Sequence, residues 1–595
     1  MRYKAKGWRW LALVAVLSWL VGCMQEPSSP KDVVDEPDVD AAVDVGSVED
    51  VGLAEVKVDA GPDPTDGVFD PDRLLNVVIT LDPKDWDELR YQSRSLIDII
   101  GPDCLESPST SPFTWFLADV SVDGVAFQNV GLRKKGLLGS LSDTRPSLKV
   151  VFDKYAKGQR FEGLERMTFN NARQDPSKVN QCITYLLMDL AGVPAPRCNY
   201  ARLSVNGMDL GIYVHVESIK KDFIRRHFAD DAGNLYEGTL SDFREGWTGT
   251  FQPKGDTPPG IEDIQDVIDA LDVPDDELVA AISKVIDLDA FLTFWAMESM
   301  VGHWDGYSGN TNNFYIYKNP ETQRLHFIPW GADATLFDQE GEGAGQLPKS
   351  VQTVGALSRR LYLHPSTRSM YVERMKNLTA VLWNESALIA EVDRMEALIK
   401  PHVLPWMLEW MEEGLSQKRA YINKRGNEIL KELESPPTWA PPLREPPCFK
   451  PAGNIAGGFQ TTWGTAAVEN LFQTGTGTLD VDVPGFDETI LQVGSKSGYG
   501  TEGDNKGMAT FAVAGQLASG GYLFAFFVTA PELVVPEATI PIDWQKMRGY
   551  VYYAPPAGEG QLVGLLANGK IVFQKAGLKY GDPIEATFSG ELFSP

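Results

Sequence analysis

The chain has 595 residues, which is too long for one hydrophobic core and predicts two or three domains. Hydrophobic residues make up 43% and aromatic residues 10% of it, a composition typical of globular proteins. The formal net charge is −28, and this excludes a nucleic-acid binder because contacts to phosphate need a basic surface.

The N-terminus carries the pattern of a bacterial export signal. Basic residues come first, at Arg2, Lys4, Lys6 and Arg9. The apolar run Trp10–Val21 that follows is too short to span a bilayer. It ends in Leu-Val-Gly-Cys23, which matches the lipobox that precedes a lipidated cysteine. We therefore expect residues 1–23 to be a lipoprotein signal, with Cys23 anchoring the exported protein to the cell envelope. In a Gram-negative cell Met24, rather than aspartate, favours the outer membrane.

An acidic segment follows the anchor. Between Lys31 and Asp72 there are fourteen Asp or Glu residues against two lysines. Such a segment buries too little apolar surface to offset chain entropy, so residues 24–73 are predicted to be a disordered linker. A calcium-binding array is the alternative, although the segment lacks the spacing of an EF-hand loop.

Residues 74–434 have the pattern of a mixed α+β domain. Strands are predicted at Leu75–Leu81, Trp115–Val122, Val125–Leu132, Ser147–Phe152, Tyr200–Val205 and Gly211–Glu217. Asp82-Pro83 predicts one helix start, and Asp175-Pro176-Ser177 predicts another that ends at Gly192. From Ile261 to about Leu433 the pattern is mostly helical, interrupted between Trp304 and Trp330.

The C-terminal part has a different pattern. Residues 435–451 contain seven prolines and are predicted to be a linker. In residues 452–595 short apolar stretches alternate with Gly, Pro and Asp turns, which predicts an all-β domain of the sandwich or jelly-roll kind. The stretches include Tyr522–Thr529, Gly549–Tyr553, Leu562–Leu566 and Lys570–Gln574.

Four cysteines remain besides Cys23, and an exported protein can join them in two disulfides. Three pairings are possible among Cys104, Cys182, Cys198 and Cys448. Cys182 and Cys198 are closest in sequence and are the pair that we expect to be joined.

The residues with the clearest chemistry lie between His303 and Phe337. Asp305 is followed five residues later by Asn310, and after two predicted strands comes Asp333. Phosphoryl transfer needs a carboxylate to orient the acceptor hydroxyl, and oxygen ligands from Asn and Asp to hold Mg²⁺. The spacing alone is a weak signal, since both groups could merely cap turns.

The order of the parts strengthens this interpretation. Arg133 and Lys135 lie on a basic hairpin, and Lys149 lies on the next strand. A helix and the Gly211–Glu217 strand, which could act as a hinge, then precede Asp305. This is the order of phosphate loop, strand lysine, helix, hinge and catalytic loop in protein kinases. A solvated lysine at a strand edge is the alternative for Lys149.

A set of short motifs resembles the CotH (spore coat protein H) kinase family over about Leu74 to Leu433. The motifs are Arg133-x-Lys-Gly136, Pro146-Ser-Leu-Lys149, Gln159-Arg-Phe-Glu-Gly163, Ala191-Gly-Val-Pro-Ala-Pro196, Asn206-Gly207, Gly211-Ile-Tyr-Val214, Asn234-Leu-Tyr236, Trp304-Asp-Gly-Tyr307, Asn313-Phe-Tyr315 and Pro329-Trp330.

The resemblance implies an exported, atypical protein-kinase-like fold that uses ATP and Mg²⁺ or Mn²⁺ on serine or threonine of exported proteins. By it Asp305 would be the catalytic residue, and the metal ligands would be Asn310, Asn313 and Asp333. The residues that bind nucleotide would be Arg133, Lys135, Lys149 and Glu217.

Three parts of the sequence depart from the family pattern. Gly331 stands where the family has the first acid of Asp-x-Asp, Leu137 and Leu138 replace the polar end of the basic hairpin, and Gln181 stands where a glutamate would pair the strand lysine. Two functions therefore stay open. One is an active kinase, and the other is a non-catalytic surface lipoprotein whose degenerate kinase fold binds a protein or a glycan.

Overall fold

The structure is a computed structural model that describes residues 63–255, 260–338, 347–438, 441–468, 470–501, 505, 507–544, 546–557 and 560–595. The predicted signal peptide, the lipidation site Cys23 and most of the acidic segment lie outside these residues. Within the described ranges, none of the helices combines the length and the apolar character needed to cross a membrane.

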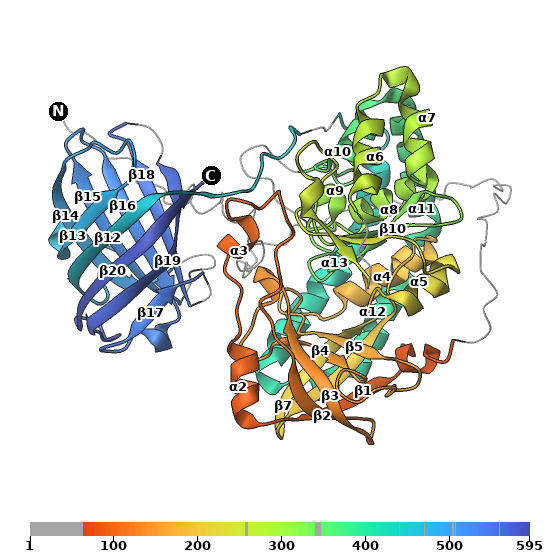
Figure 1. Cartoon of the computed structure of the whole chain (residues 1–595), viewed down its shortest axis with the longest axis horizontal. Helices are drawn as coiled ribbons and strands as arrows, with labels where there is room; N and C mark the ends of the chain where they lie inside the picture. Colours follow the sequence, from red (N-terminus) through yellow and green to blue (C-terminus); the bar gives the residue numbers. More distant parts are fainter. Residues whose placement is uncertain are drawn as a thin grey trace, which may run out of the picture.

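The first domain begins with a closed seven-stranded barrel in the order β1-β2-β3-β4-β5-β7-β6, at the bottom of Figure 1. Its strands are β1 (Leu74–Thr80), β2 (Phe116–Val122), β3 (Val125–Lys135), β4 (Ser147–Val151), β5 (Arg166–Asn170), β6 (Cys198–Val205) and β7 (Met208–Val216). β1 closes the barrel by pairing in parallel with β6. The Gly211–Glu217 segment, considered above as a hinge, is thus mostly a central barrel strand.

Alternating apolar residues explain why these segments form a barrel. In β1 the side chains of Leu75, Val77 and Ile79 are fully buried while their neighbours face outward. Two hairpins have Asp123-Gly124 and Asn206-Gly207 turns with φ of 50° and 86°, and of 50° and 80°. These left-handed backbones suit the right-handed twist of the strands that they join.

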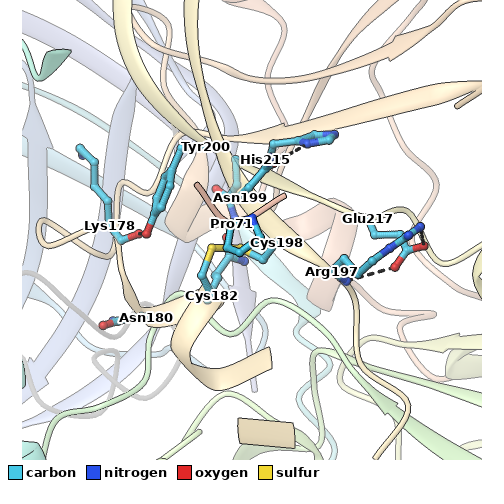
Figure 2. The surroundings of a disulfide bond; sticks show 12 residues. Pro71, Lys178, Asn180, Cys182, Arg197, Cys198, Asn199, Tyr200, His215 and Glu217 are labelled. Carbon is cyan, nitrogen blue, oxygen red and sulfur yellow. Dashed lines mark hydrogen bonds and ion pairs between the residues drawn. A yellow bond between two sulfur atoms is a disulfide. The ribbon is translucent and has the colours of Figure 1, made fainter. Parts of the chain in front are cut away.

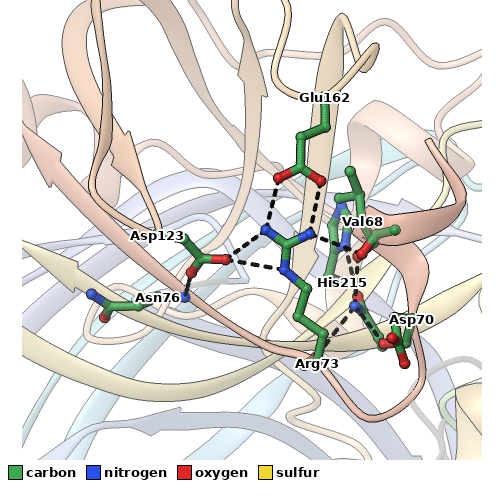
Figure 3. A network of polar contacts seen from close by, with 9 residues as sticks. Val68, Asp70, Arg73, Asn76, Asp123, Glu162 and His215 are labelled. Atoms are coloured by element: carbon green, nitrogen blue, oxygen red, sulfur yellow. Dashed lines mark hydrogen bonds and ion pairs between the residues drawn. The ribbon is translucent and has the colours of Figure 1, made fainter. Parts of the chain in front are cut away.

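The ordered domain starts earlier than the predicted boundary at Leu74. Val68 and Phe69, in the short helix η2 (Asp66–Phe69), are buried against the barrel. Arg73 fixes this entry, because its guanidinium donates to Glu162 at 2.8 Å and to Asp123 at 2.8 Å (Figure 3). Residues 63–73 therefore belong to the first domain rather than to the acidic linker.

Most helices of the first domain come after β7. They are α5 (Lys221–Phe228), α6 (Glu262–Leu271), α7 (Asp275–Val285), α8 (Leu288–Met300), α9 (Tyr307–Asn310), α10 (Ala356–Leu363), α11 (Pro365–Leu382), α12 (Glu385–Ile399) and α13 (Leu408–Glu432), while α4 (Asn180–Leu190) lies between β5 and β6, and α2 (Pro83–Tyr91) and α3 (Ile97–Ile100) precede β2. A second sheet, in the order β11-β10-β8-β9, lies among them. Its strands are β8 (Leu235–Gly238), β9 (Phe251–Lys254), β10 (Phe314–Lys318) and β11 (Leu325–Pro329).

Helix α4 starts later than Asp175-Pro176-Ser177 predicts. Asp175 does cap the backbone here, but its carboxylate accepts from the N–H of Asn180 at 2.9 Å across an intervening turn. Lys178 in that turn has a φ of 66°, which interrupts the helical backbone before Asn180.

The proline-rich segment between the domains lies against the first domain. Backbone oxygens of this segment accept hydrogen bonds from the Tyr362 hydroxyl (to Pro437, 2.7 Å) and from Nε of Arg359 (to Pro441, 2.7 Å). A disulfide joins its Cys448 to Cys104 of the first domain. We call residues 435–449, as far as they are described, the strap.

The second domain is a closed nine-stranded barrel, at the left of Figure 1. Its strands are β12 (Lys450–Thr462), β13 (Gly475–Asp482), β14 (Ile490–Tyr499), β15 (Ala509–Leu517), β16 (Tyr522–Thr529), β17 (Thr539–Ile542), β18 (Met547–Ala554), β19 (Gln561–Lys575) and β20 (Pro583–Ser594). The domain is all-β as predicted, but β20 pairs with β12 and closes one barrel instead of two stacked sheets. The two apolar stretches after Gln561 form one strand with an irregularity at Asn568, where φ is 51°.

The second barrel packs on the first domain through a small apolar cluster. Leu96, Ile99 and Ile100, at α3, are buried together with Trp544, Tyr550, Leu565 and Phe593 of the barrel. The strap joins the same cluster, because the Phe449 ring is buried in it and its N–H donates to the Ile100 oxygen at 2.6 Å. The barrel, the strap and α3 therefore form one packed unit.

Candidate functional site

Two loops carry the predicted acidic residues, and the second sheet brings them together. Phe314 at the start of β10 pairs with Pro329 at the end of β11. The loop before β10 and the loop after β11 therefore leave the sheet at the same end. The first loop contains Asp305 and the second contains Asp333, and their charges interact.

Three asparagine side chains hold the Asp305 carboxylate. Nδ2 of Asn310 and Nδ2 of Asn312 donate to one oxygen at 2.6 and 3.1 Å, and Nδ2 of Asn313 donates to the other at 2.7 Å. Burial raises the pKa of Asp305, and the three amides oppose that rise by stabilising the carboxylate. The sequence analysis singled out Asn310 and Asn313 but missed Asn312.

The local backbone explains this convergence. Helix α9 is a single turn, and the next residue, Thr311, has a φ of 53°. Asn313 follows with a φ of 49°, a left-handed conformation that asparagine tolerates better than most residues. Two reversals within three residues fold the asparagine side chains back onto Asp305.

A buried carboxylate, that of Glu298 in α8, accepts hydrogen bonds from the residues that follow Asp305. It accepts from the N–H of Tyr307 at 2.9 Å, and from the N–H and hydroxyl of Ser308 at 2.8 and 2.6 Å. Burial raises the pKa of Glu298 to about 7, and these donors moderate the rise. A glutamate inside an apolar helix gives no spacing signal, so sequence reasoning could not assign it this role.

Asp333 lies buried beside the Asp305 loop. Burial is the main cause that raises the pKa of Asp333 to about 7; the charges of Asp305 and Asp175 contribute to this rise, and Lys135 opposes it. Nδ2 of Asn180, at the start of α4, donates to the Asp333 backbone oxygen at 2.7 Å. Two carboxylates that disfavour each other's ionisation form a site that a cation would stabilise.

Positive side chains gather on the barrel strands that face this site. Arg133 on β3 lies directly opposite Lys149 on β4. Like charges at such a position are destabilising unless an anion lies between or beside them. Burial, together with the charges of Arg133, Lys135 and Lys220, lowers the pKa of Lys149 to about 7. Such clustering in a strongly acidic protein would favour the binding of an anion such as a phosphate group.

A glutamate does act on the strand lysine, but it comes from an unexpected place. Glu237 on β8 interacts electrostatically with both Lys149 and Lys135. Burial alone would raise the pKa of Glu237, but Lys254, Tyr315 and Lys149 lower it overall. Gln181 on α4 instead accepts from Asn170 at 3.1 Å. The glutamate that acts on Lys149 is therefore Glu237 on a strand, and not a residue at position 181 on the helix.

Glu217 comes directly after the last residue of β7. Its carboxylate is ion-paired with Arg197 at 2.7 Å (Figure 2). It is also ion-paired with Arg226 at 2.5 Å. The Cys182–Cys198 disulfide lies nearby and joins α4 to β6 (Figure 2). Since both oxygens of Glu217 already have cationic partners, the structure gives it a place in a salt-bridge network, and its predicted role toward nucleotide stays a prediction.

The donor set fits a divalent metal that prefers oxygen. The Asp333 carboxylate and the side-chain oxygens of Asn310 and Asn313 are hard ligands of the kind that Mg²⁺ and Mn²⁺ take. The amide nitrogens of both asparagines donate to Asp305, which leaves their oxygens to face away from it. Arg133, Lys135 and Lys149 fit a phosphate group beside this metal.

Gly331 cannot simply be restored to the family's acid. Its φ is 55°, and a Cβ built on it would lie 2.6 Å from the side-chain oxygen of Asn313. An aspartate here would therefore strain the backbone and displace a candidate metal ligand. The side chain of Asn313 lies in the space that a side chain at position 331 would enter.

Fold and site together define an α+β domain with a carboxylate–asparagine loop facing a basic barrel rim. A family model described as CotH kinase protein matches residues 132–437, which is more than half of the 595 residues. The chain belongs to the CotH kinase family. The matched residues include Asp305, Asp333 and the basic residues of the site, but neither the strap beyond Pro437 nor the second barrel.

Curated relatives come from bacteria and fungi. The chain is 22% identical to "Inner spore coat protein H" of Bacillus subtilis over 257 residues, 41% of this chain and 70% of that protein. It is 22% identical to "Spore coat protein homolog 1" and 24% identical to "Invasin CotH7", both of Rhizopus delemar, over 58% and 42% of this chain. These matches span 56% and 45% of the fungal proteins, about half their length.

Among solved structures, the chain is similar to the Helicobacter pylori proinflammatory kinase CtkA. The match covers 48% of this chain and 94% of that one, at 7% identity and a TM-score of 0.24. A similarity that weak is no argument about activity.

Proposed function

We propose that the first domain is an atypical protein kinase that binds ATP with Mg²⁺ or Mn²⁺ and phosphorylates serine or threonine of exported proteins. One observation carries this proposal. Asp305 is held by three amides next to a second carboxylate, Asp333, and that carboxylate interacts electrostatically with Lys135 of β3, whose charge also acts on Lys149 of β4. Membership of the CotH kinase family supports it.

Asp305 is the group that takes the proton of the acceptor hydroxyl. As the hydroxyl oxygen bonds to the terminal phosphorus, the bond from that phosphorus to the nucleoside diphosphate breaks, and the proton passes to the Asp305 carboxylate. Burial raises the pKa of Asp305, which favours this acceptance, while the asparagines fix the direction of its oxygens.

The other residues of the site bind the donor. Asp333, Asn310 and Asn313 would hold a divalent metal, which would supply positive charge to neutralise the phosphates. Lys149, Lys135 and Arg133 place positive charge beside the same phosphates, and Glu237 interacts electrostatically with the two lysines. The substrate is proposed to be an exported protein because of the predicted signal before Cys23.

A nucleotide titration tests this proposal. ATP should bind the wild-type protein in millimolar Mg²⁺ and lose most of its affinity in EDTA. Asp333→Ala should weaken the Mg²⁺-dependent affinity by at least ~10-fold, because loss of a first ligand should cost no less than loss of an outer partner. Asp222→Ala, at an exposed ion pair on α5, is the matched control and should leave binding unchanged. Isothermal titration calorimetry measures the ATP affinity of wild type in Mg²⁺, of wild type in EDTA, and of the two variants.

The second candidate is a non-catalytic surface protein that binds a protein or a glycan. It is favoured by Gly331, which stands where the family has an acid and has a positive φ of 55°. If the wild-type protein binds no nucleotide with either Mg²⁺ or Mn²⁺, the kinase proposal is wrong and this alternative stands.

A further inference from the structure

Arg444 of the strap reaches the catalytic loop of the first domain. Its Nη1 donates to the side-chain oxygen of Asn310 at 2.8 Å and to the Asn310 backbone oxygen at 3.2 Å. The charge of Arg444 interacts with the charges of Asp305 and Asp242. Arg444 lies 134 residues along the chain from Asn310 and outside the family match, so nothing in the local sequence indicates this contact.

The position of this guanidinium conflicts with metal binding. The Nδ2 of Asn310 donates to Asp305, so the oxygen of Asn310 is the atom left for a metal. Arg444 uses that same oxygen. Mg²⁺ requires near-ideal octahedral oxygen ligation, and a second cation beside it would repel it. Arg444 therefore occupies the place of a cation in the proposed metal site.

Several contacts keep Arg444 there. Its own backbone oxygen accepts a hydrogen bond from Arg244 of the first domain. Three residues earlier, the oxygen of Pro441 accepts from Arg359 at 2.7 Å. Four residues later, Cys448 is bonded to Cys104. Arg444 is thus held between two fixed points, and the second of them continues directly into the β-barrel.

We propose that the strap is an autoinhibitory element in which Arg444 substitutes for the divalent metal on Asn310, held in place by the Cys104–Cys448 disulfide. This inference rests on the proposed function, because it assigns regulation to the same site. Metal binding must displace Arg444, and whatever moves the second barrel away from α3 promotes that displacement. The barrel is then the regulatory input to the kinase site.

The test is a titration of the full chain with Mn²⁺ in the presence of ADP. The concentration of free Mn²⁺ is measured by electron paramagnetic resonance. Arg444→Gln should bind Mn²⁺ ~10-fold more tightly than wild type, because it removes a charge-assisted hydrogen bond from a ligand atom. Arg444→Lys should fall between the two. The double variant Cys104→Ser, Cys448→Ser, which lacks the disulfide, should also bind Mn²⁺ more tightly than wild type. Combined with Arg444→Gln, it should increase the Mn²⁺ affinity no further.

Arg360→Gln is the matched control. It also removes an arginine that donates to backbone oxygens, but those belong to Leu271 and Val273, far from the strap in sequence. It should leave Mn²⁺ affinity unchanged.

The outcomes separate the two levels of the account. If wild type binds Mn²⁺ and Arg444→Gln binds it no better, the autoinhibitory role is wrong while the proposed function stands. If Arg444→Gln instead weakens ADP binding, Arg444 serves the phosphates and the autoinhibitory role is again wrong. If no variant binds Mn²⁺ or ADP, the proposed function fails and its regulation with it.

Discussion

Asp305→Asn should lower the rate of phosphoryl transfer by about 10²- to 10⁴-fold, the range that a general base contributes. Asparagine has nearly the shape of aspartate but cannot take the acceptor's proton. Nucleotide affinity should change little, because the metal ligands lie on Asn310, Asn313 and Asp333. Steady-state kinetics on a serine-containing peptide, together with calorimetric nucleotide binding, separates the two effects.

Folding must be checked in the same variant, since three amides donate to Asp305. The melting temperature of Asp305→Asn should stay within a few degrees of wild type. The matched exposed variant Asp222→Ala should keep both rate and affinity. An Asp305→Asn protein that folds, binds nucleotide and retains more than a tenth of the wild-type rate would show that Asp305 is not the base.

Glu298→Ala should have the largest effect on stability. It removes the acceptor of three hydrogen bonds from Tyr307 and Ser308 at a site with no solvent exposure. Leaving these donors unpaired, and leaving a cavity, should lower the free energy of unfolding by roughly 3 kcal/mol or more. Glu277→Ala, at an exposed position on α7, should change it by less than about 0.5 kcal/mol. Urea denaturation measures both, and equal effects would contradict the supporting role of Glu298.

The same glutamate should make stability depend on pH. The pKa of Glu298 is raised from 4.5 to about 7 in the folded protein, so the folded state holds this proton more tightly than the unfolded chain. Stability therefore falls as pH rises from about 4.5 to 7, by about 3 kcal/mol from this group. Asp242 and Asp333 titrate in the same sense, so the comparison with Glu298→Gln isolates Glu298. A difference between the two proteins that stays constant with pH would contradict this.

The strands and hairpins of the first domain could be predicted from the sequence because their signals are local. The burial of Leu75, Val77 and Ile79 follows from alternation, and the turns at Asp123 and Asn206 follow from Asx-Gly pairs. The prediction of a sandwich for the second domain was wrong, because the way a sheet closes is not a local signal. Alternation shows which side chains face inward, but closure depends on the pairing of β12 with β20, more than 100 residues apart.

The site was predictable where it follows chain order and unpredictable where it depends on distant contacts. Asp305, Asn310, Asn313 and Asp333 lie on loops at one end of a hairpin, and their proximity follows from adjacent strands. Glu237 and Arg444 enter the site from another strand and from beyond the helices. A glutamate on an alternating strand and an arginine among prolines give no local signal, and only the fold brings them to Lys149 and Asn310.

The most direct test of the account is a crystal structure of the full chain with Mn²⁺ and a non-hydrolysable ATP analogue, with the metal located by anomalous scattering. We expect one strong metal peak roughly 2.1 Å from oxygens of Asp333 and Asn310. The phosphates of the analogue should lie against Lys149. Arg444 should no longer contact Asn310. If a crystal grown with saturating Mn²⁺ and analogue shows the analogue bound elsewhere, or shows no metal peak at Asp333, the proposed kinase site is wrong.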